Sequence, residues 1–172
     1  MARKPRFAPP HYALHITQRG NYRQPVFFSD EDRECFLSLV DHHADQRDVL
    51  VHGHVLMTNH FHLVVTGQVE QAISRFMQHV TGQYAQYLHR RLNRRGRLWQ
   101  SQFFSCVLDR RHFLTALAYV YLNPQRARLV ETAAEYRWSS AAAHVGLTEG
   151  PGWLDLAALH GRATANDWAA RL

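Results

Sequence analysis

The sequence predicts an α+β fold built on an antiparallel sheet. Two observations carry this prediction: apolar residues alternate along four short segments, and they recur at helical spacing in two segments between them. The resulting order of strand, helix, strand, strand, helix and strand is the ferredoxin-like βαββαβ arrangement, in which both helices cover one face of the sheet. A further helix and a helical or irregular tail follow the fourth strand.

Each element has a local signal. Tyr12, Leu14 and Ile16 alternate with less apolar residues and predict the first strand. Ser29 precedes an acidic first turn and is the expected cap of the first helix, while Thr58 and Asn59 make the expected hairpin turn. The other strands are expected around residues 49–57, 60–66 and 103–108, and the other helices around residues 73–88 and 110–123. In this order the third strand is central.

Composition favours one domain that binds an anionic partner. The 172 residues can bury an adequate core, and we expect residues 1–145 to form the domain and residues 146–172 to form a tail that packs on it or extends it. Lys and Arg together number 20 against 14 Asp and Glu, a net charge of +6, and Arg far outnumbers Lys. Because guanidinium groups suit phosphates and stacked bases, the charge favours nucleic acid. A merely basic soluble protein is the alternative.

Cysteine use and hydropathy favour the cytoplasm. Cys35 and Cys106 form no Cys-x-x-Cys pair, so the sequence indicates neither a disulfide framework nor a cysteine zinc site. No apolar run reaches the roughly 18 residues that cross a bilayer, and no secretory leader is recognised. We therefore expect a reduced, cytoplasmic protein without a membrane role.

The triplet His60-Phe61-His62 lies on the predicted third strand. Residues two apart on a strand project to the same face, so both imidazoles are expected to reach one metal ion. Phe61, Leu63 and Val65 would face the two helices, which leaves the histidines on the opposite, more open face. Hydrogen-bonded structural histidines are the alternative for an isolated pair of this kind.

The predicted third helix brings a tyrosine and an amide to that open face. Its apolar stripe is centred near Leu117 and includes Tyr121, for which we predict a packing role. Tyr119 lies almost opposite the stripe, and Asn123 follows it at i, i+4, near the expected end of the helix before Pro124. The two imidazoles and the Asn123 amide oxygen would form a three-ligand site for a divalent ion. Next to such an ion, Tyr119 is the expected nucleophile toward a phosphodiester.

Residues 90–97 are densely basic and lie near several aromatic residues. This mixture suits phosphate contact and base stacking, although basic residues at a helix end also complement the helix dipole. The expected DNA-binding residues are Arg19, Arg90, Arg91, Arg94, Arg95, Arg97 and Trp99.

Several ordered motifs support a family assignment. They are Arg19-Gly20-Asn21, Leu56-Met57-Thr58-Asn59-His60-Phe61-His62-Leu63, Trp99-Gln100-Ser101-Gln102-Phe103, Tyr119-Val120-Tyr121-Leu122-Asn123-Pro124 with Arg126-Ala127, and Tyr136-Arg137-Trp138-Ser139-Ser140. Through them nearly the whole chain resembles the HUH single-tyrosine transposases, specifically the REP-associated tyrosine transposases (RAYTs).

The resemblance implies a catalytic domain that nicks single-stranded DNA at or near hairpin-forming palindromes and transfers the strand. Tyr119 would be the nucleophile that forms a 5′-phosphotyrosine, and His60, His62 and Asn123 would hold Mg²⁺ or Mn²⁺. The implied setting is the bacterial cytoplasm, in association with the nucleoid. A monomer is the expected species and a dimer the alternative.

The sequence departs from the family pattern at two positions. Thr58 stands where proline is frequent in the hairpin turn, and Arg128 stands where glycine is frequent after the Asn-Pro pair. Neither is an expected ligand or the nucleophile. A second pair, His52 and His54, lies on the preceding strand around Gly53, and we assign it to structure or DNA contact.

Two other functions stay open. One is a domesticated module that binds hairpin DNA or RNA without cleavage. The other is a metallohydrolase in which metal-bound water attacks and Tyr119 positions the substrate. The tail leaves a choice too: Trp153 and Trp168 would pack in a short helical appendage or cover the hairpin-binding surface.

Overall fold

The computed structural model of the chain describes residues 8–160. Four strands form one antiparallel sheet in the order β2-β3-β1-β4. The strands are β1 (Ala13–Arg19), β2 (Val49–Met57), β3 (His60–Gly67) and β4 (Phe104–Leu108). The helices are α1 (Asp30–Gln46), α2 (Ala72–Arg91), α3 (Arg110–Tyr121), α4 (Asn123–Arg126), α5 (Ala141–His144) and α6 (Ala157–His160), with short 3-10 turns η1 (Asn21–Arg23) and η2 (Ala133–Glu135). The expected βαββαβ order and the central third strand are confirmed.

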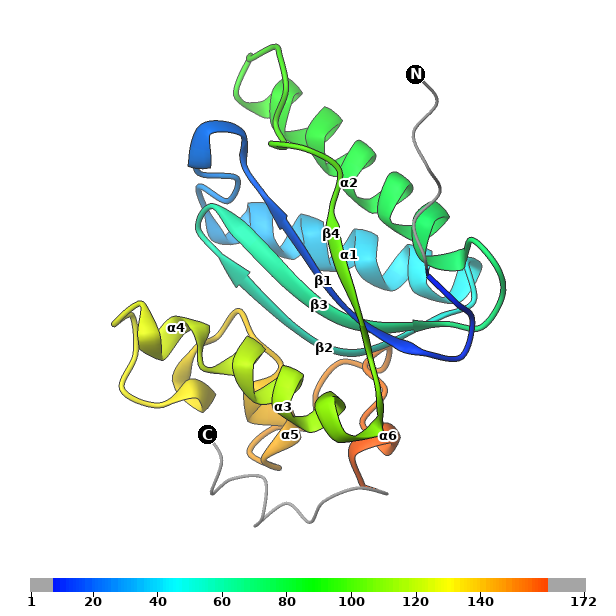
Figure 1. The fold of residues 1–172 in the computed structure, drawn as a ribbon. Coiled ribbons are helices and arrows are strands. Elements are labelled where there is room, and N and C mark those ends of the chain that lie inside the picture. The colour runs from blue at the N-terminus through cyan, green and yellow to red at the C-terminus, as the bar shows by residue number, and fades with distance from the viewer. Residues whose placement is uncertain (1–7, 161–172) are drawn as a thin grey trace.

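The two faces of the sheet carry separate layers. Helices α1 and α2 cover one face, and α3 with the segments after it lies against the other (Figure 1). Phe61, Leu63 and Val65 of β3 belong to the core under α1 and α2, whereas Val64 packs with α3 residues. Strand alternation therefore sends His60 and His62 to the α3 side, as the sequence predicts.

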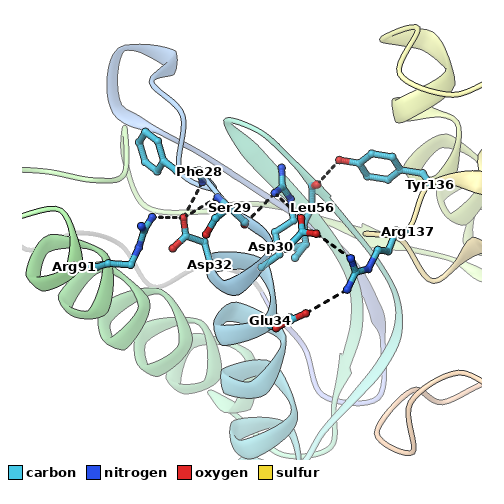
Figure 2. A network of polar contacts seen from close by, with 10 residues as sticks. Phe28, Ser29, Asp30, Asp32, Glu34, Leu56, Arg91, Tyr136 and Arg137 are labelled. Carbon is cyan, nitrogen blue, oxygen red and sulfur yellow. Dashed lines mark hydrogen bonds and ion pairs between the residues drawn. The ribbon is translucent and has the colours of Figure 1, made fainter.

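A buried carboxylate joins the start of α1 to the end of α2. Asp32 is fully buried, and its Oδ2 accepts hydrogen bonds from the backbone N–H groups of Phe28 at 2.8 Å and Ser29 at 3.2 Å. The same oxygen lies 2.6 Å from Nη2 of Arg91 (Figure 2). A buried carboxylate is stable only with such hydrogen-bond and ion-pair partners. Arg91 therefore has a structural role in addition to any contact with DNA.

Helix α3 is docked on β2 through Tyr121, which is fully buried as predicted. Its hydroxyl lies 2.9 Å from Oγ of Ser140 and 2.6 Å from Nδ1 of His144. Ser140 Oγ also accepts a hydrogen bond from the backbone N–H of His54 at 2.9 Å. The helix approaches the strand so closely at Gly53 that a Cβ there would lie 2.6 Å from Leu117. The buried Tyr121 ring and the close approach at Gly53 fix the rotation of α3 about its axis, and the hydroxyl contacts add stability.

The described part of the tail packs on β2. The backbone N–H of Asp155 donates to the Val51 carbonyl at 2.8 Å, and the Asp155 carboxylate lies 3.2 Å from Nδ1 of His52. The Trp153 ring lies 5.4 Å from the His54 ring. His52 and His54 are both buried, so the second histidine pair belongs to structure. Trp168 lies outside the described residues.

The chain does not leave the helical conformation at Asn123-Pro124. Helix α3 ends at Tyr121, two residues earlier than predicted, and α4 begins at Asn123 after Leu122, whose ψ is −5°. Proline is tolerated there because the first turn of a helix needs no partner for its N–H. Arg128 then adopts a φ of +57°, in the left-handed region that favours glycine.

We predict that Gly53→Ala destabilises the protein by about 1–3 kcal/mol, because the added methyl group separates α3 from β2. Gly82→Ala is the matched control: no atom lies within 4 Å of a Cβ there, and the change stabilises α2 by about 1 kcal/mol. Urea unfolding of both variants measures the difference. Equal stability would show that the close approach at Gly53 is dispensable.

We also predict that Arg128→Gly stabilises the protein by about 0.5–1 kcal/mol, because glycine adopts the left-handed conformation without a steric cost. Arg128→Ala removes the same exposed side chain but keeps the Cβ, so its stability should stay within about 0.5 kcal/mol of wild type. Thermal unfolding of the two variants separates backbone strain from loss of charge. A gain shared by both would assign the effect to charge.

Candidate functional site

Two neighbouring central strands place their polar residues on one face. Thr17 of β1 pairs with His62 of β3, and Arg19 pairs with His60. His15 follows on the same face of β1, since it lies two residues from Thr17. These five side chains form a polar row on the α3 side of the sheet.

Helix α3 adds the tyrosine. The Tyr119 ring lies 5.9 Å from the ring of His62 and 5.8 Å from that of His15, and 45% of the residue is exposed. The His60 and His62 rings are 5.1 Å apart. The structure thus brings together the predicted His60, His62 and Tyr119. It also adds His15, whose ring stacks on that of His62 with 5.0 Å between the centroids. The alternation of residues along the first strand could have predicted this position.

Hydrogen bonds orient both predicted metal ligands. His60 Nδ1 lies 2.6 Å from Asn59 Oδ1, and because an amide oxygen only accepts, Nδ1 carries the proton. His62 Nδ1 lies 2.7 Å from the Thr17 hydroxyl, which can accept from it, and 2.8 Å from His15 Nε2. In the described part of the chain, Nε2 of His60 and of His62 makes no hydrogen bond. His60 Nε2 therefore has the lone pair that a metal requires, and His62 Nε2 has it in the tautomer whose Nδ1 donates to Thr17.

The surroundings keep these imidazoles neutral. Burial lowers the pKa of His60 to about 4, with a further contribution from the nearby Arg19 charge. Burial likewise lowers the pKa of His62 to about 3, helped by His15, His60 and Arg19. Neutral imidazole is the form that binds metal, so the pair fits a divalent ion at neutral pH.

The Asn123 side chain contacts the last turn of α3. Its Nδ2 donates to the backbone carbonyls of Tyr119 at 2.8 Å and Val120 at 3.2 Å, so the amide caps the end of α3. Its Oδ1 makes no hydrogen bond with the described residues and stays available as a ligand. Within residues 8–160, no group of three or more His, Cys, Asp or Glu could hold a metal ion. The third ligand from Asn123 stays a prediction.

Arginines flank the site, which has almost no acidic groups. Arg126 of α4 lies over the Tyr119 ring, with its guanidinium carbon 5.1 Å from the centroid. Arg19 lines a cavity of about 380 Å³ together with Tyr119 and His62. The other residues that line it are His15, Thr17, Gln18, Gln100, Ser101, Gln102 and Phe104. None is a carboxylate, so the cavity suits a phosphate-bearing ligand.

The predicted DNA-binding residues fall into two groups. Arg90, Arg94, Arg95 and Arg97 are exposed at and after the end of α2. Trp99, in contrast, is half-buried.

The half-buried Trp99 ring packs against core aromatics. It lies 5.6 Å from the Phe61 ring and 6.1 Å from the Tyr84 ring. Its indole N–H donates to the Thr81 carbonyl at 3.0 Å. The structure therefore gives Trp99 a packing role that the sequence-based prediction missed, because Phe61 and Tyr84 lie far from it along the chain.

Comparison with known proteins assigns the chain to a family. The profile described as "Transposase IS200 like" matches residues 10–123, from the start of the sheet to Asn123. The chain therefore belongs to the IS200-like transposase family, and its role is DNA processing of the transposase type. None of the curated proteins matches the chain by sequence.

Solved structures resemble this chain to different degrees. A REP-associated tyrosine transposase bound to a REP hairpin superimposes with a TM-score of 0.72 at 15% identity, over 88% of this chain and 89% of that one. The tRNA(His) guanylyltransferase of Saccharomyces cerevisiae gives 0.52 at 7% identity, over 99% and 80%. A putative transposase of Deinococcus radiodurans R1 gives 0.48 at 16% identity, over 74% and 92%. The first likeness confirms the predicted fold class.

The part of the chain from residue 8 to residue 160 contains no helix long and apolar enough to cross a membrane.

We predict that acid destabilises the fold through His62. Its pKa is about 6.5 when unfolded and about 3 when folded, so the unfolded chain binds the proton more tightly. Its contribution to stability is complete above pH 6.5 and is lost as pH falls toward 3, by up to about 1.4 kcal/mol per pH unit. Urea unfolding between pH 7 and pH 4 should show a shallower pH dependence for His62→Gln. Parallel curves for the two proteins would contradict the lowered pKa.

Proposed function

We propose that the protein nicks single-stranded DNA and transfers the strand at hairpin-forming palindromic repeats, through a covalent 5′-phosphotyrosine. The observation that carries this proposal is the placement of a half-exposed tyrosine beside two oriented, neutral imidazoles. Membership of the transposase family supports the class of reaction. The REP hairpin bound to a protein of the same fold supports a DNA hairpin as the partner.

The reaction is a transesterification at phosphorus. The phenolic oxygen of Tyr119 attacks the scissile phosphate, a bond forms between that oxygen and phosphorus, and the bond from phosphorus to the 3′-oxygen breaks. The phenolic proton passes to solvent, and the departing 3′-oxygen takes up a proton. The products are a 5′-phosphotyrosine and a free 3′-hydroxyl. Because the phosphodiester energy is conserved, another 3′-hydroxyl can reverse the step and join a new strand.

His60, His62 and Asn123 are the residues that would hold Mg²⁺ or Mn²⁺. When bound, such an ion neutralises charge on the phosphoryl oxygens during the displacement. The Asn59 amide oxygen keeps His60 Nε2 free for it, and Thr17 does the same for His62 Nε2 when its hydroxyl accepts from Nδ1. The oxygen ligand from Asn123 suits these hard ions better than a thiolate or a third imidazole would.

Arg126 and Arg19 have separate roles beside the nucleophile. The Arg126 guanidinium lies over the Tyr119 ring, where it holds the ring in place and stabilises negative charge as the phenol ionises. Arg19 lines the cavity next to His62 and can contact the nonbridging phosphate oxygens. Together they attract the DNA backbone to the tyrosine.

The exposed arginines Arg90, Arg94, Arg95 and Arg97 are the proposed phosphate contacts for the hairpin duplex. Arg91 contributes less to phosphate binding because it is paired with Asp32. Trp99 stabilises the segment that follows these arginines, through its hydrogen bond to the Thr81 carbonyl. We propose that the protein acts as a monomer on chromosomal DNA in the bacterial cytoplasm.

We predict that wild-type protein forms a covalent adduct with a labelled single-stranded hairpin in Mn²⁺, and that Tyr119→Phe forms none because it lacks the attacking oxygen. Tyr121→Phe is the matched control: it removes a buried hydroxyl two residues away and should keep the adduct while lowering stability. Denaturing gel electrophoresis detects the protein-linked DNA. An adduct with Tyr119→Phe would refute the assignment of the nucleophile.

The same experiment separates the other two functions. A free 5′-phosphate product without protein-linked DNA would indicate attack by water. If wild type and a His60→Ala/His62→Ala double variant bind the hairpin equally and neither cleaves it, the protein is a binding module.

A further inference from the structure

Phe104 is an exposed aromatic residue next to the candidate site. It begins the edge strand β4 and is 64% exposed, whereas most of the phenylalanines are core residues. No ring contact within residues 8–160 involves it. An aromatic ring on the open face of an edge strand adds little to the core, and its exposed face can stack on a planar ligand.

Strand register places Phe104 in line with the candidate metal ligand. Thr17 of β1 pairs with His62 on one side and with Phe104 on the other. Directly paired residues point to the same face, and neighbouring strands lie about 4.8 Å apart. Phe104 is therefore about 10 Å across the sheet from His62. A base attached to a phosphate held near His62 can reach that ring.

The cavity between them combines the ring with uncommitted amides. Phe104, Gln100 and Gln102 line it together with Tyr119. Both glutamines are exposed, and neither side-chain amide makes a hydrogen bond within the described part of the chain. Amide groups pair with the donor and acceptor edges of nucleobases, and aromatic rings stack on their faces.

The segment that carries these amides is anchored to β1. The backbone N–H of Gln100 donates to the Arg19 carbonyl at 2.9 Å. The buried Gln18 side chain donates from Nε2 to the Ser101 carbonyl at 3.2 Å. Residues 100–102 thus have a fixed position beside Phe104, which lowers the cost of ordering them around a ligand.

We propose that Phe104 and the amides of Gln100 and Gln102 form a subsite for the unpaired nucleobase next to the scissile phosphate. The base stacks on Phe104, and the amides contact its edge, so this subsite helps to select the cleavage position. The proposal rests on the proposed function, since it assumes that a phosphodiester binds at His62 and Tyr119.

The test uses Tyr119→Phe protein, which should bind without cutting. Hairpin oligonucleotides carry 2-aminopurine at one position at a time along the single-stranded flank. We expect one position, or two adjacent ones, to be quenched by stacking. Adding Phe104→Ala should abolish that quenching and weaken binding by at least about fivefold, whereas Phe104→Tyr keeps the ring and should retain both. Leu147→Ala, which truncates another exposed apolar residue, is the control and should change neither.

An abasic site at the quenched position gives the sharper test. It should weaken binding to the parent protein, and Phe104→Ala should then add nothing, because the base and the ring are lost as a pair. If Phe104→Ala weakens binding equally with and without the base, or leaves quenching unchanged, the proposal is wrong. Adduct formation by wild type is measured in parallel, and its absence counts against the proposed function. If the adduct forms but Phe104→Ala leaves the quenching at every position unchanged, only the subsite is overturned.

Discussion

The site depends on one register, the antiparallel pairing of β1 with β3. It sets Thr17 beside His62 and Arg19 beside His60, and it gives the opposite face to Leu14 and Ile16 in the core. Because side chains alternate, a slip by one residue would bury the polar row and expose the core residues. The apolar face packed on α1 and α2 therefore stabilises the register that assembles the histidines. The same strand pairing therefore both buries the core residues and sets the geometry of the site.

Docking of α3 then determines which tyrosine reaches the row. Tyr121 is held in the interior by Ser140 and His144, and Gly53 leaves room for the close approach. Tyr119, two residues earlier and about 200° away around the helix, must then lie on the open side. The two tyrosines differ little in local sequence. Their packing separates a structural hydroxyl from an exposed one. A change at Gly53 would therefore act on Tyr119, the proposed nucleophile, through the orientation of α3.

Much of this arrangement could be predicted because it follows from local periodicity. Alternation placed His60 and His62 together, and helical phase separated Tyr119 from the buried stripe. Contacts between distant segments escaped prediction. Trp99 packs against the core because its ring contacts Phe61 and Tyr84. Arg91 is partly occupied because Asp32 is buried. The exposed Phe104 became informative only when its pairing with Thr17 placed it in the cavity.

The electrostatics of the site favour an anionic ligand, which agrees with the proposed phosphodiester. The histidines are kept neutral by burial and by Arg19, so they can donate lone pairs at neutral pH. The cavity lining contains Arg19 and no carboxylate, and Arg126 lies over Tyr119. A lining of this kind, with arginines and without carboxylates, suits the negative charge of a phosphate. Binding of the substrate and of a divalent ion should therefore support each other, since the phosphate offers oxygen ligands to an ion for which this chain alone provides few.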